Sequence, residues 1–553
     1  MTRKSWPALT AAILAVAACG GLQAADDAPA EDRVAIDFVT GLNDPVVGYI
    51  NERIRIGWQD NEVSASPLAD DEEWLRRVTL DLSGRIPTLG EVADFVADDS
   101  PTKRADKIDA LLDSEAFVDH WATQWTNLLI GRNAPQRTNR DGLLKFLRDS
   151  IALGRPWDEI VVDLITAEGN FRENGAVNFL LAKLDGNPRD DDYHVEATAS
   201  TTRLFLGMQV QCTQCHNHPF NDWKQDQFWE FNSFLRQIRR NDVRDAMGND
   251  DYSELVARDY TDPVFFEKRS GLMQVAYPNY FGTQVDPKSE DRRGEFAKLV
   301  AGGADGENLL AKAFVNRSWS QLYGYAFTRP VDDMGPHNPP SHPELLDRLT
   351  AEFVASDYDV RQLFRWMANA EAYNLTSRFN RDGSNSYDDP AAGEVPLFSH
   401  AYVKSLSAEQ LYDSMVVATG AGQDARGDRA KQTRDRWLRD FLRIFGGNEE
   451  DEPTLFAGSI PQALLMMNGE LIQRALDGES ESVFTKILAS GDLRTDKDRV
   501  EALYRAALGR KPTRSESSSL TSALGKARGD EKLWLYQDLY WALLNSNEFI
   551  FNH

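Results

Sequence analysis

Apolar residues recur three and four positions apart along most of this chain, and this spacing limits the fold more strongly than any other feature. Side chains at that spacing lie on one face of an α-helix. The pattern is clear in residues 108–112, 157–164, 345–353 and 533–544. The sequence therefore predicts a mainly α, multi-helical protein.

Three segments have the Ser/Thr-x-x-Glu form of a helix start, in which two side chains satisfy free backbone amides. These segments begin at Thr88, Ser341 and Thr513. We expect each of them to mark a helix boundary, not an active site.

One pattern occurs near both ends of the chain. Residues 84–91 and 509–516 share the form GRxPTxxE, and residues 111–117 and 543–549 share LLxSxxF. We interpret each pair of segments as a capped helical hairpin in which a phenylalanine anchors the end of the second helix against the core. This interpretation predicts a duplicated packing unit and says nothing about catalysis.

The chain has 553 residues, of which 42% are hydrophobic and 27% are charged, so it is too long for one hydrophobic core. The helical period weakens between residues 241 and 305, where glycine, proline, aspartate and aromatic residues accumulate. We therefore expect a first helical domain at 31–245, an irregular junction with short strands at 246–300, and a second helical domain at 301–553.

Residues 1–24 have the features of a signal peptide, with a positive region at Arg3 and Lys4, an apolar run and small residues before a cleavage site. Cys19 lies in a lipobox-like sequence, which would leave a lipid anchor on that residue, whereas Ala24 suits an ordinary signal peptidase. We expect an exported protein that is periplasmic or associated with the cell envelope. No later run approaches the roughly 18 apolar residues that a membrane-spanning helix needs.

The net charge is −26, and removal of the leader with Arg3 and Lys4 takes it to −28. Such an acidic surface repels phosphate backbones and anionic membranes, so nucleic acid is excluded as a partner class. The surface could attract a basic redox partner or cations, although solubility in a salty environment is the simpler explanation of the charge.

Cys212, Cys215 and His216 form a CxxCH sequence, which is the attachment signature of c-type haem. Two thiols three residues apart can add to the porphyrin vinyl groups, and the adjacent imidazole then becomes an axial ligand of the iron. The third cysteine of the chain, Cys19, lies in the leader. We therefore predict haem c as the cofactor, bound through these three residues.

Two other arrangements would use the same residues. Cys212 and Cys215 could form a disulfide in an oxidising compartment. They could also bind zinc or iron together with His216 or His218, in which case a fourth ligand would come from another part of the chain.

The sequence around the motif, residues 205–226, resembles the planctomycete cytochrome-c-like family of exported proteins, known as domain of unknown function 1549. Four later segments resemble the domain of unknown function 1553 that usually follows it: residues 315–319, 331–347, 460–464 and 541–549. The resemblance implies a haem cofactor and leaves the activity unassigned. The loop after His216 differs from that of small soluble cytochromes c, in which a methionine ligand follows.

Linear spacing does not identify the second axial ligand of the iron. We place His194 first, because it precedes the apolar helix that leads into the motif, and its simpler interpretation is a helix-entry residue. The remaining distal candidates are Met208, His120, His337, His342 and His400.

A second site could form from Asp332, Asp333, Asn338 and His342. Two carboxylates, an amide and an imidazole on a proline-stiffened loop could bind a cation or a sugar. The simpler interpretation is a loop that prepares the following helix, in which Arg317 could pair with one of the aspartates.

The sequence thus predicts an exported c-type haem-binding protein that acts in electron transfer or redox chemistry at the cell envelope. The alternative is a non-redox surface scaffold or carbohydrate-binding module, with a cell-envelope polysaccharide as partner and the CxxCH sequence as a metal clip or disulfide. No Ser-His-Asp order, phosphate loop or HExxH motif appears, so an enzymatic activity and catalytic residues stay unassigned.

Overall fold

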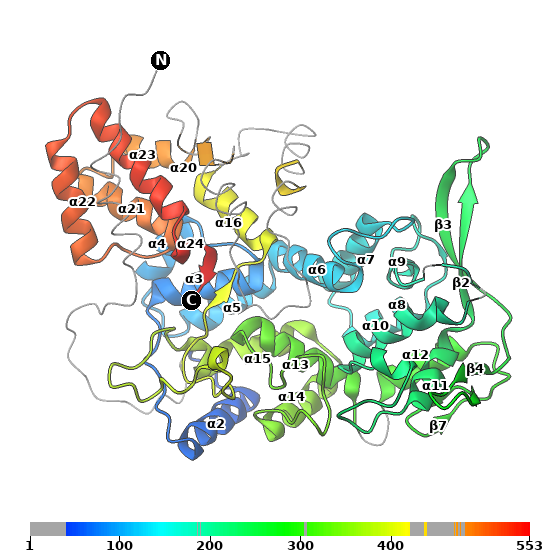
Figure 1. The fold of residues 1–553 in the computed structure, drawn as a ribbon. Helices are drawn as coiled ribbons and strands as arrows, with labels where there is room; N and C mark the ends of the chain where they lie inside the picture. The colour runs from blue at the N-terminus through cyan, green and yellow to red at the C-terminus, as the bar shows by residue number, and fades with distance from the viewer. Residues whose placement is uncertain are drawn as a thin grey trace.

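The computed structural model describes residues 40–184, 186–188, 190–303, 307–420, 436–439, 469, 472–473, 476 and 482–553. The expected leader with Cys19 and the segment 460–464 lie outside these residues. The described chain is mainly helical, as the sequence predicted (Figure 1). None of the described helices is both long and apolar enough to span a membrane.

Helices follow one another from one end of the described chain to the other. Those before residue 240 are α2 (Pro45–Asp60), α3 (Asp71–Ser83), α4 (Leu89–Ala97), α5 (Lys103–Leu112), α6 (Glu115–Ile130), α7 (Arg140–Ala152), α8 (Trp157–Thr166), α9 (Val177–Leu181), the 3-10 helix η1 (Asp191–His194), α10 (Val195–Leu206), the 3-10 helix η2 (Gln211–Gln214) and α11 (Gln225–Leu235). Those after it are α12 (Arg292–Gly302), α13 (Leu309–Tyr323), α14 (Pro343–Ala355), α15 (Val360–Asn369), η3 (Glu371–Asn374), η4 (Pro390–Ala392), α16 (Ala408–Thr419), α20 (Val483–Ala489), α21 (Asp496–Leu508), α22 (Arg514–Lys526), α23 (Asp530–Leu544) and α24 (Asn547–Ile550).

Short strands form small antiparallel sheets. They are β1 (Gly169–Asn170), β2 (Ile238–Arg244), β3 (Asp250–Ala257), β4 (Val264–Glu267), β5 (Met273–Ala276), β6 (Asn279–Tyr280), β7 (Thr283–Gln284), β8 (Lys404–Ser405) and β9 (Phe551–Asn552). β3 lies between β1 and β2, while β4 pairs with β5, β6 with β7, and β8 with β9. The β2–β3 hairpin projects from the body as an arm (Figure 1). Strands β3 to β7 fall in the segment where the sequence predicted short strands.

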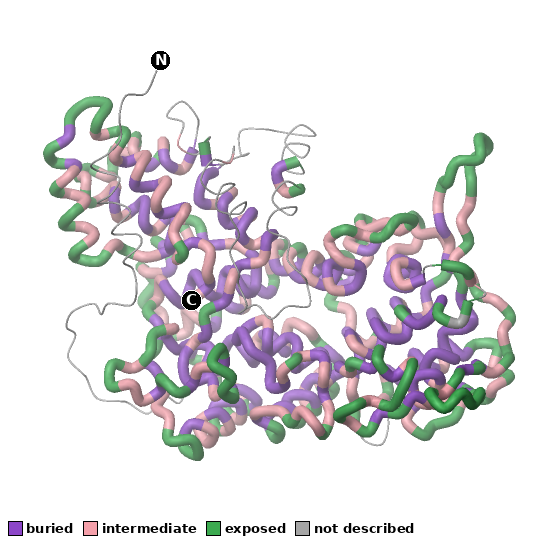
Figure 2. Tube along the Cα trace, in the orientation of Figure 1, coloured by how far each residue is buried: buried purple, intermediate pink, exposed green. Residues whose placement is uncertain are grey.

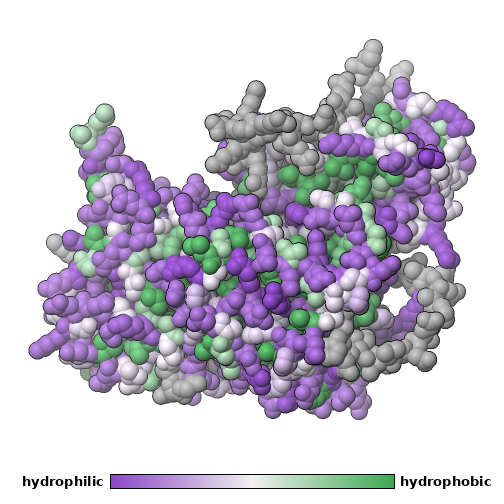
Figure 3. Space-filling view, turned by 180° about the vertical axis from the view of Figure 1, so that it is seen from behind, coloured by the Kyte–Doolittle hydropathy of each residue, from purple (hydrophilic) through white to green (hydrophobic). Residues whose placement is uncertain are grey.

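Buried apolar residues form two clusters. The larger cluster draws on residues from Val46 to Tyr402. The smaller cluster is built mainly from residues between Leu406 and Phe549, and it also includes Leu80 and Ile86 from the first part of the chain. Buried segments lie along the inward sides of the helices, and much of the surface seen from behind is hydrophilic (Figures 2 and 3). The second core therefore contains side chains from both ends of the sequence.

The pattern that occurs twice in the sequence forms two similar local structures. In both copies a glycine ends a helix with a left-handed backbone, Gly84 after α3 at φ 72° and Gly509 after α21 at φ 74°. Thr88 and Thr513 then begin α4 and α22 with complete capping boxes. The predicted duplication is confirmed for these described residues.

In each copy an arginine pairs with the glutamate of the capping box. Arg85 donates two hydrogen bonds to Glu91, at 2.9 and 3.1 Å, and Arg510 donates two to Glu516, at 3.0 and 3.3 Å. The paired geometry explains why arginine and glutamate stand six residues apart in both copies of the pattern.

The phenylalanines of the pattern occupy a different place from the one predicted. Ser114 and Ser546 accept the backbone N–H groups of Phe117 and Phe549, at 3.1 and 3.3 Å. Each phenylalanine therefore lies in the first turn of the next helix, α6 or α24, and not at the end of a helix. Both rings are fully buried, so their predicted anchoring role is confirmed.

The two copies pack against each other through a buried arginine. Arg76 of α3 donates hydrogen bonds to the carbonyl oxygens of Ala507, Glu548 and Phe549, at 3.2, 3.3 and 3.0 Å. The side chain is fully buried, and burial lowers its pKa to about 10. This contact joins the early helices to the last helices of the described chain.

The predicted capping box at Ser341 is wrong. Helix α14 begins at Pro343, so its cap position falls on His342, which makes no side-chain capping bond. Proline is favoured at the first helical position because it has no N–H to satisfy, and it moves the helix start beyond the serine.

Candidate functional site

The CxxCH motif lies on a surface turn between two buried helices. Helix α10 ends at Leu206, and the chain then runs through Gly207 and η2 before α11 begins. Thr213 is fully buried, and its Oγ1 donates to the carbonyl oxygen of Val210 at 2.5 Å within the same turn. Gly207 caps α10 with a left-handed backbone at φ 65°, a conformation that favours glycine.

The three reactive groups of the motif face solvent. Cys212 and Cys215 are exposed and their thiols are free. His216 is exposed, and its Nδ1 lies 2.7 Å from the carbonyl oxygen of Asn217. Because a carbonyl only accepts hydrogen bonds, Nδ1 carries the proton and Nε2 keeps its lone pair. This is the tautomer that a histidine ligand uses when its Nε2 binds a metal.

His218 is held inside its own loop. Its Nδ1 accepts the backbone N–H groups of Phe220 and Asn221, at 3.3 and 3.1 Å. Nδ1 is therefore turned toward the loop and away from an external ion. Burial is the main cause that lowers the pKa of His218, and the Asp333 carboxylate opposes that effect.

A loop from the second half of the chain flanks the motif. The backbone N–H of Met334 donates to the carbonyl oxygen of Gly207 at 2.8 Å. The ring centroids of His337 and His218 are 5.6 Å apart, and His337 Nε2 lies 3.1 Å from Asp333 Oδ2. Burial raises the pKa of the Cys212 thiol, and the Asp333 carboxylate raises it further. Asp333 and His337 are thus neighbours of the motif.

The four residues of the predicted second site do not come together around one position. Asp332 is buried and pairs with Arg317 and with Arg203, the latter at 3.5 Å, which is a structural role. Asn338 Nδ2 donates to the backbone carbonyl oxygen of Asp333 at 2.9 Å and stabilises the loop. The predicted pairing of Arg317 with an aspartate is confirmed.

His342 lies apart from the motif. Its ring centroid is 5.5 Å from that of Phe398 and 6.2 Å from that of Phe327. Burial lowers its pKa to about 4, so the imidazole is neutral at physiological pH. A cation or sugar site that combines His342 with Asp333 does not fit this arrangement.

His194 lies in the core at the opposite end of α10 from the motif. Helix α10 has 12 residues, which corresponds to about 18 Å along its axis. His194 is fully buried, its Nε2 lies 2.9 Å from the carbonyl oxygen of Ile238, and burial lowers its pKa to about 3. The structure supports the helix-entry interpretation and does not bring His194 to His216.

The other distal candidates are divided between the core and the motif. His120 is surrounded by α3 and α6, where its Nδ1 would lie 2.4 Å from a Cβ on Gly84, and His400 lies 3.8 Å from Asp388. Met208 is half-buried directly after Gly207. His337 is the candidate whose ring neighbours the motif loop.

The β4–β5 hairpin flanks the other side of the motif. Gln225 Nε2 donates to the carbonyl oxygens of both Gln214 and Glu267, at 3.1 and 3.0 Å. Trp229 Nε1 donates to the same Gln214 oxygen at 3.1 Å, and its ring stacks on Phe266 with centroids 5.8 Å apart. The hairpin and the motif are therefore held together by two side chains of α11.

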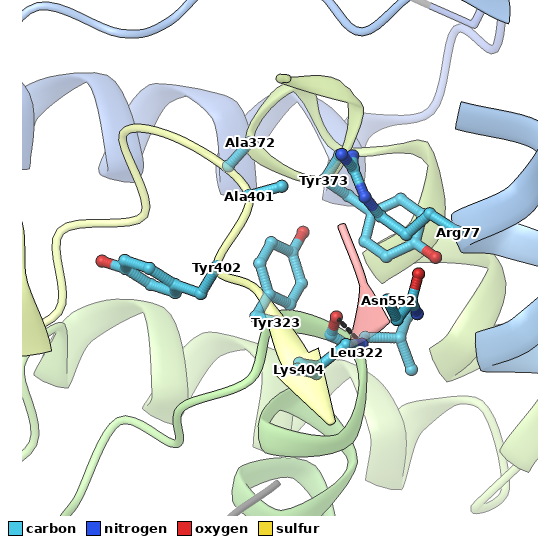
Figure 4. A pocket seen from close by; sticks show the side chains of 9 residues that line it. All are labelled: Arg77, Leu322, Tyr323, Ala372, Tyr373, Ala401, Tyr402, Lys404 and Asn552. Carbon is cyan, nitrogen blue, oxygen red and sulfur yellow. Dashed lines mark hydrogen bonds between the residues drawn. The ribbon is translucent and has the colours of Figure 1, made fainter. Parts of the chain in front are cut away.

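A cavity of about 10 Å³, room for at most one water molecule, lies elsewhere, where residues from distant parts of the chain meet (Figure 4). Lys404 and Asp81 form a buried ion pair beside it at 2.6 Å. Tyr373 and Asn552 each donate to the Asp81 carboxylate at 2.7 Å. Because the Lys404 ammonium and the Asp81 carboxylate are paired with each other and with neighbouring groups, this ion pair has a structural role.

The sequence indicated His337 only as a candidate for the second axial ligand of the iron, and not as a member of the predicted second site. The available signal was the spacing of Asp333 and His337, four residues apart on the same proline-rich loop. Within the described residues, His, Cys, Asp and Glu side chains do not form a group of three arranged to hold a metal ion.

Two family models match the chain. One, described as "Protein of unknown function (DUF1549)", matches residues 49–240 and contains the motif. The other, described as "Protein of unknown function (DUF1553)", matches residues 292–524 and contains the loop with Asp333 and His337. Neither a curated protein nor a solved structure matches the chain. The resemblance seen in the motifs is confirmed, and the chain belongs to the proteins in which a DUF1549 domain is followed by a DUF1553 domain.

Proposed function

We propose that this protein is an exported c-type haem-binding protein that acts in electron transfer or redox chemistry at the cell envelope. Cys212 and Cys215 would hold the porphyrin through thioether bonds, and His216 would ligate the iron. One observation carries this proposal. Two free, exposed thiols and an imidazole with an available Nε2 lie together on one anchored surface turn.

The residues of the turn fit the requirements of a covalent haem. Exposed thiols can be reached by a planar group much larger than a metal ion. The hydrogen bond from His216 Nδ1 to the Asn217 carbonyl oxygen orients the ring and leaves Nε2 as the ligand atom. When bound, haem supplies one-electron redox chemistry, and the protein contributes the axial ligand and the surroundings.

The leader expected in residues 1–24 predicts export. Export supports the haem assignment, because free thiols outside the cytoplasm otherwise tend to be oxidised. A metal clip that uses His218 receives less support, because Nδ1 of His218 accepts two backbone N–H groups and the neutral ring then carries its proton on Nε2. The acidic net charge of −26 favours a basic protein as redox partner.

Expression in a host with cytochrome c maturation machinery tests the proposal. The purified protein should give a pyridine haemochrome spectrum, and the haem should stay with the chain after acid–acetone extraction. Cys212→Ala with Cys215→Ala should abolish this retention. Gln211→Ala, an exposed position in the same 3-10 helix, is the matched control and should retain haem.

Colourless protein from that host would refute the proposal, and stoichiometric zinc in the same sample would identify a metal clip. Retention of haem by the double cysteine variant would equally refute the assignment of the attachment residues.

A further inference from the structure

We propose that the outer face of the β4–β5 hairpin is the apolar wall of the haem site, against which a porphyrin held at Cys212 and Cys215 packs. This inference rests on the proposed function and adds the surface that shields the group. It also assigns a role to a hairpin that no motif in the sequence singled out.

The two faces of the hairpin differ in what covers them. On the inner face Val264, Phe266 and Ala276 are buried, and Phe266 stacks on Trp229 of α11. On the outer face Phe265 pairs with Val275 across the strands, and these side chains are 53% and 46% exposed. Alternation along a strand requires one face to point outward, but it does not require that face to be apolar.

The apolar character of the outer face extends toward the hairpin turn. On the same face Met273 is 60% exposed and lies opposite the exposed Glu267, and the neighbouring Leu272 is 63% exposed. A contiguous group of exposed large apolar side chains is unusual on a soluble surface and is typical of a binding site. Phe220, in the loop after the motif, is 79% exposed as well, and its ring lies beside that of His218.

The hairpin lies next to the motif. The carbonyl oxygens of Gln214 and Glu267 lie within about 6 Å of each other, because Gln225 Nε2 donates to both at 3.1 and 3.0 Å. Gln214 immediately precedes Cys215, and Glu267 faces Met273 across the hairpin. A planar group attached to Cys215 therefore starts beside strand β4, and the proposal is that it extends over the outer face of the hairpin.

The chemistry of the strip suits a porphyrin. The ring is apolar on both faces, and burial of apolar surface is favourable whatever its shape. Haem also carries propionate carboxylates, and Arg269 is exposed at the turn of the hairpin. An arginine can bind a carboxylate through two parallel hydrogen bonds, so the turn offers a cation on a protein whose net charge is −26.

The test replaces the paired outer residues, with Phe265→Ser and Val275→Thr in one variant. Haem content per chain should stay unchanged, because the attachment residues are intact. The reduction potential should fall and the rate of imidazole binding to the ferric haem should rise, since both depend on how far haem is shielded from water. Met247→Ser is the matched control, because Met247 is 88% exposed at the tip of the β2–β3 arm. It should change neither quantity.

Normal haem content with the same potential and imidazole rate as the Met247→Ser control would overturn this inference and leave the proposed function standing. Absence of haem from the unmodified protein would overturn both. If the double variant does not fold, Val275→Thr alone keeps a β-branched residue in the strand and gives the same comparison.

Discussion

Replacement of Lys404 by methionine removes the cation of a buried ion pair while it keeps most of the side-chain volume. Lys404 Nζ lies 2.6 Å from Asp81 Oδ1 and also donates to the carbonyl oxygens of Gln321 and Leu322, at 2.9 and 2.6 Å. The pair lies beside the small cavity of Figure 4, where strand β8 approaches helix α3. The variant leaves the Asp81 carboxylate without its cation and removes the Lys404 donor from two carbonyl oxygens.

The expected loss in the free energy of unfolding is about 3–5 kcal/mol at pH 7, the range found when one partner of a buried pair is removed. Burial already raises the pKa of Asp81, and Lys404 opposes that rise. Without Lys404 the pKa of Asp81 rises further, although the donors Tyr373 and Asn552 remain. The loss should therefore reflect a charged carboxylate that the fold no longer neutralises.

Urea unfolding followed by tryptophan fluorescence measures the loss, and its pH dependence has a defined sign. A carboxyl group whose pKa is raised on folding contributes stability below its unfolded pKa of about 3.8, and that stability is lost as the pH rises through the folded pKa. The deficit of Lys404→Met relative to the unmodified protein should thus be largest at pH 7 and smaller at pH 4.

The double variant Asp81→Asn with Lys404→Met should recover much of the stability, because it has no unpaired charge. A single-variant loss below about 1 kcal/mol would refute the reasoning, since it would place the pair in the range of surface ion pairs. A deficit that grows as the pH falls would refute it as well.

Three further outcomes are expected. Thr88→Ala and Thr513→Ala should each cost about 1 kcal/mol in thermal unfolding, because each removes a helix cap, and a large difference between them would contradict the equivalence of the two repeated units. Arg76→Met should cost about 3 kcal/mol or more in urea unfolding, because it leaves buried carbonyl oxygens unpaired, and a neutral result would show that the contact between the two units contributes little. His194 has a folded pKa of about 3 against an ordinary value of 6.5, so its contribution to stability is lost as the pH falls below 6.5, by up to about 1.4 kcal/mol per pH unit. His194→Gln should flatten the measured slope between pH 6 and 4 by that amount, and an unchanged slope would contradict the assignment.

Local signals allowed much of the fold to be predicted. Helical periodicity, the capping boxes at Thr88 and Thr513, and the repeated pattern all depend on residues a few positions apart, and all of them appear in the structure. The box predicted at Ser341 failed for a local reason as well, since Pro343 competes for the helix start.

Contacts between distant residues could not be predicted in the same way. His218 and His337 meet only because the loop after α13 packs on Gly207, and nothing in the spacing of either segment indicates the other. The placement of His194 was open for the same reason, because a histidine before an apolar helix can face a cofactor or the core. Its bond to Ile238 depends on a strand that follows much later.

The smaller hydrophobic core, which takes in Leu80 and Ile86 from the early helices, limits how such proteins can be recombined. In a chimera that joins residues 49–240 of this chain to the C-terminal half of a relative, Leu80 and Ile86 would pack against side chains that do not fit them. The same holds for Arg76, whose acceptors lie beyond residue 500. The two halves should therefore evolve together. An exchange of one half should be tolerated only where the residues that contact Leu80, Ile86 and Arg76 are exchanged as well.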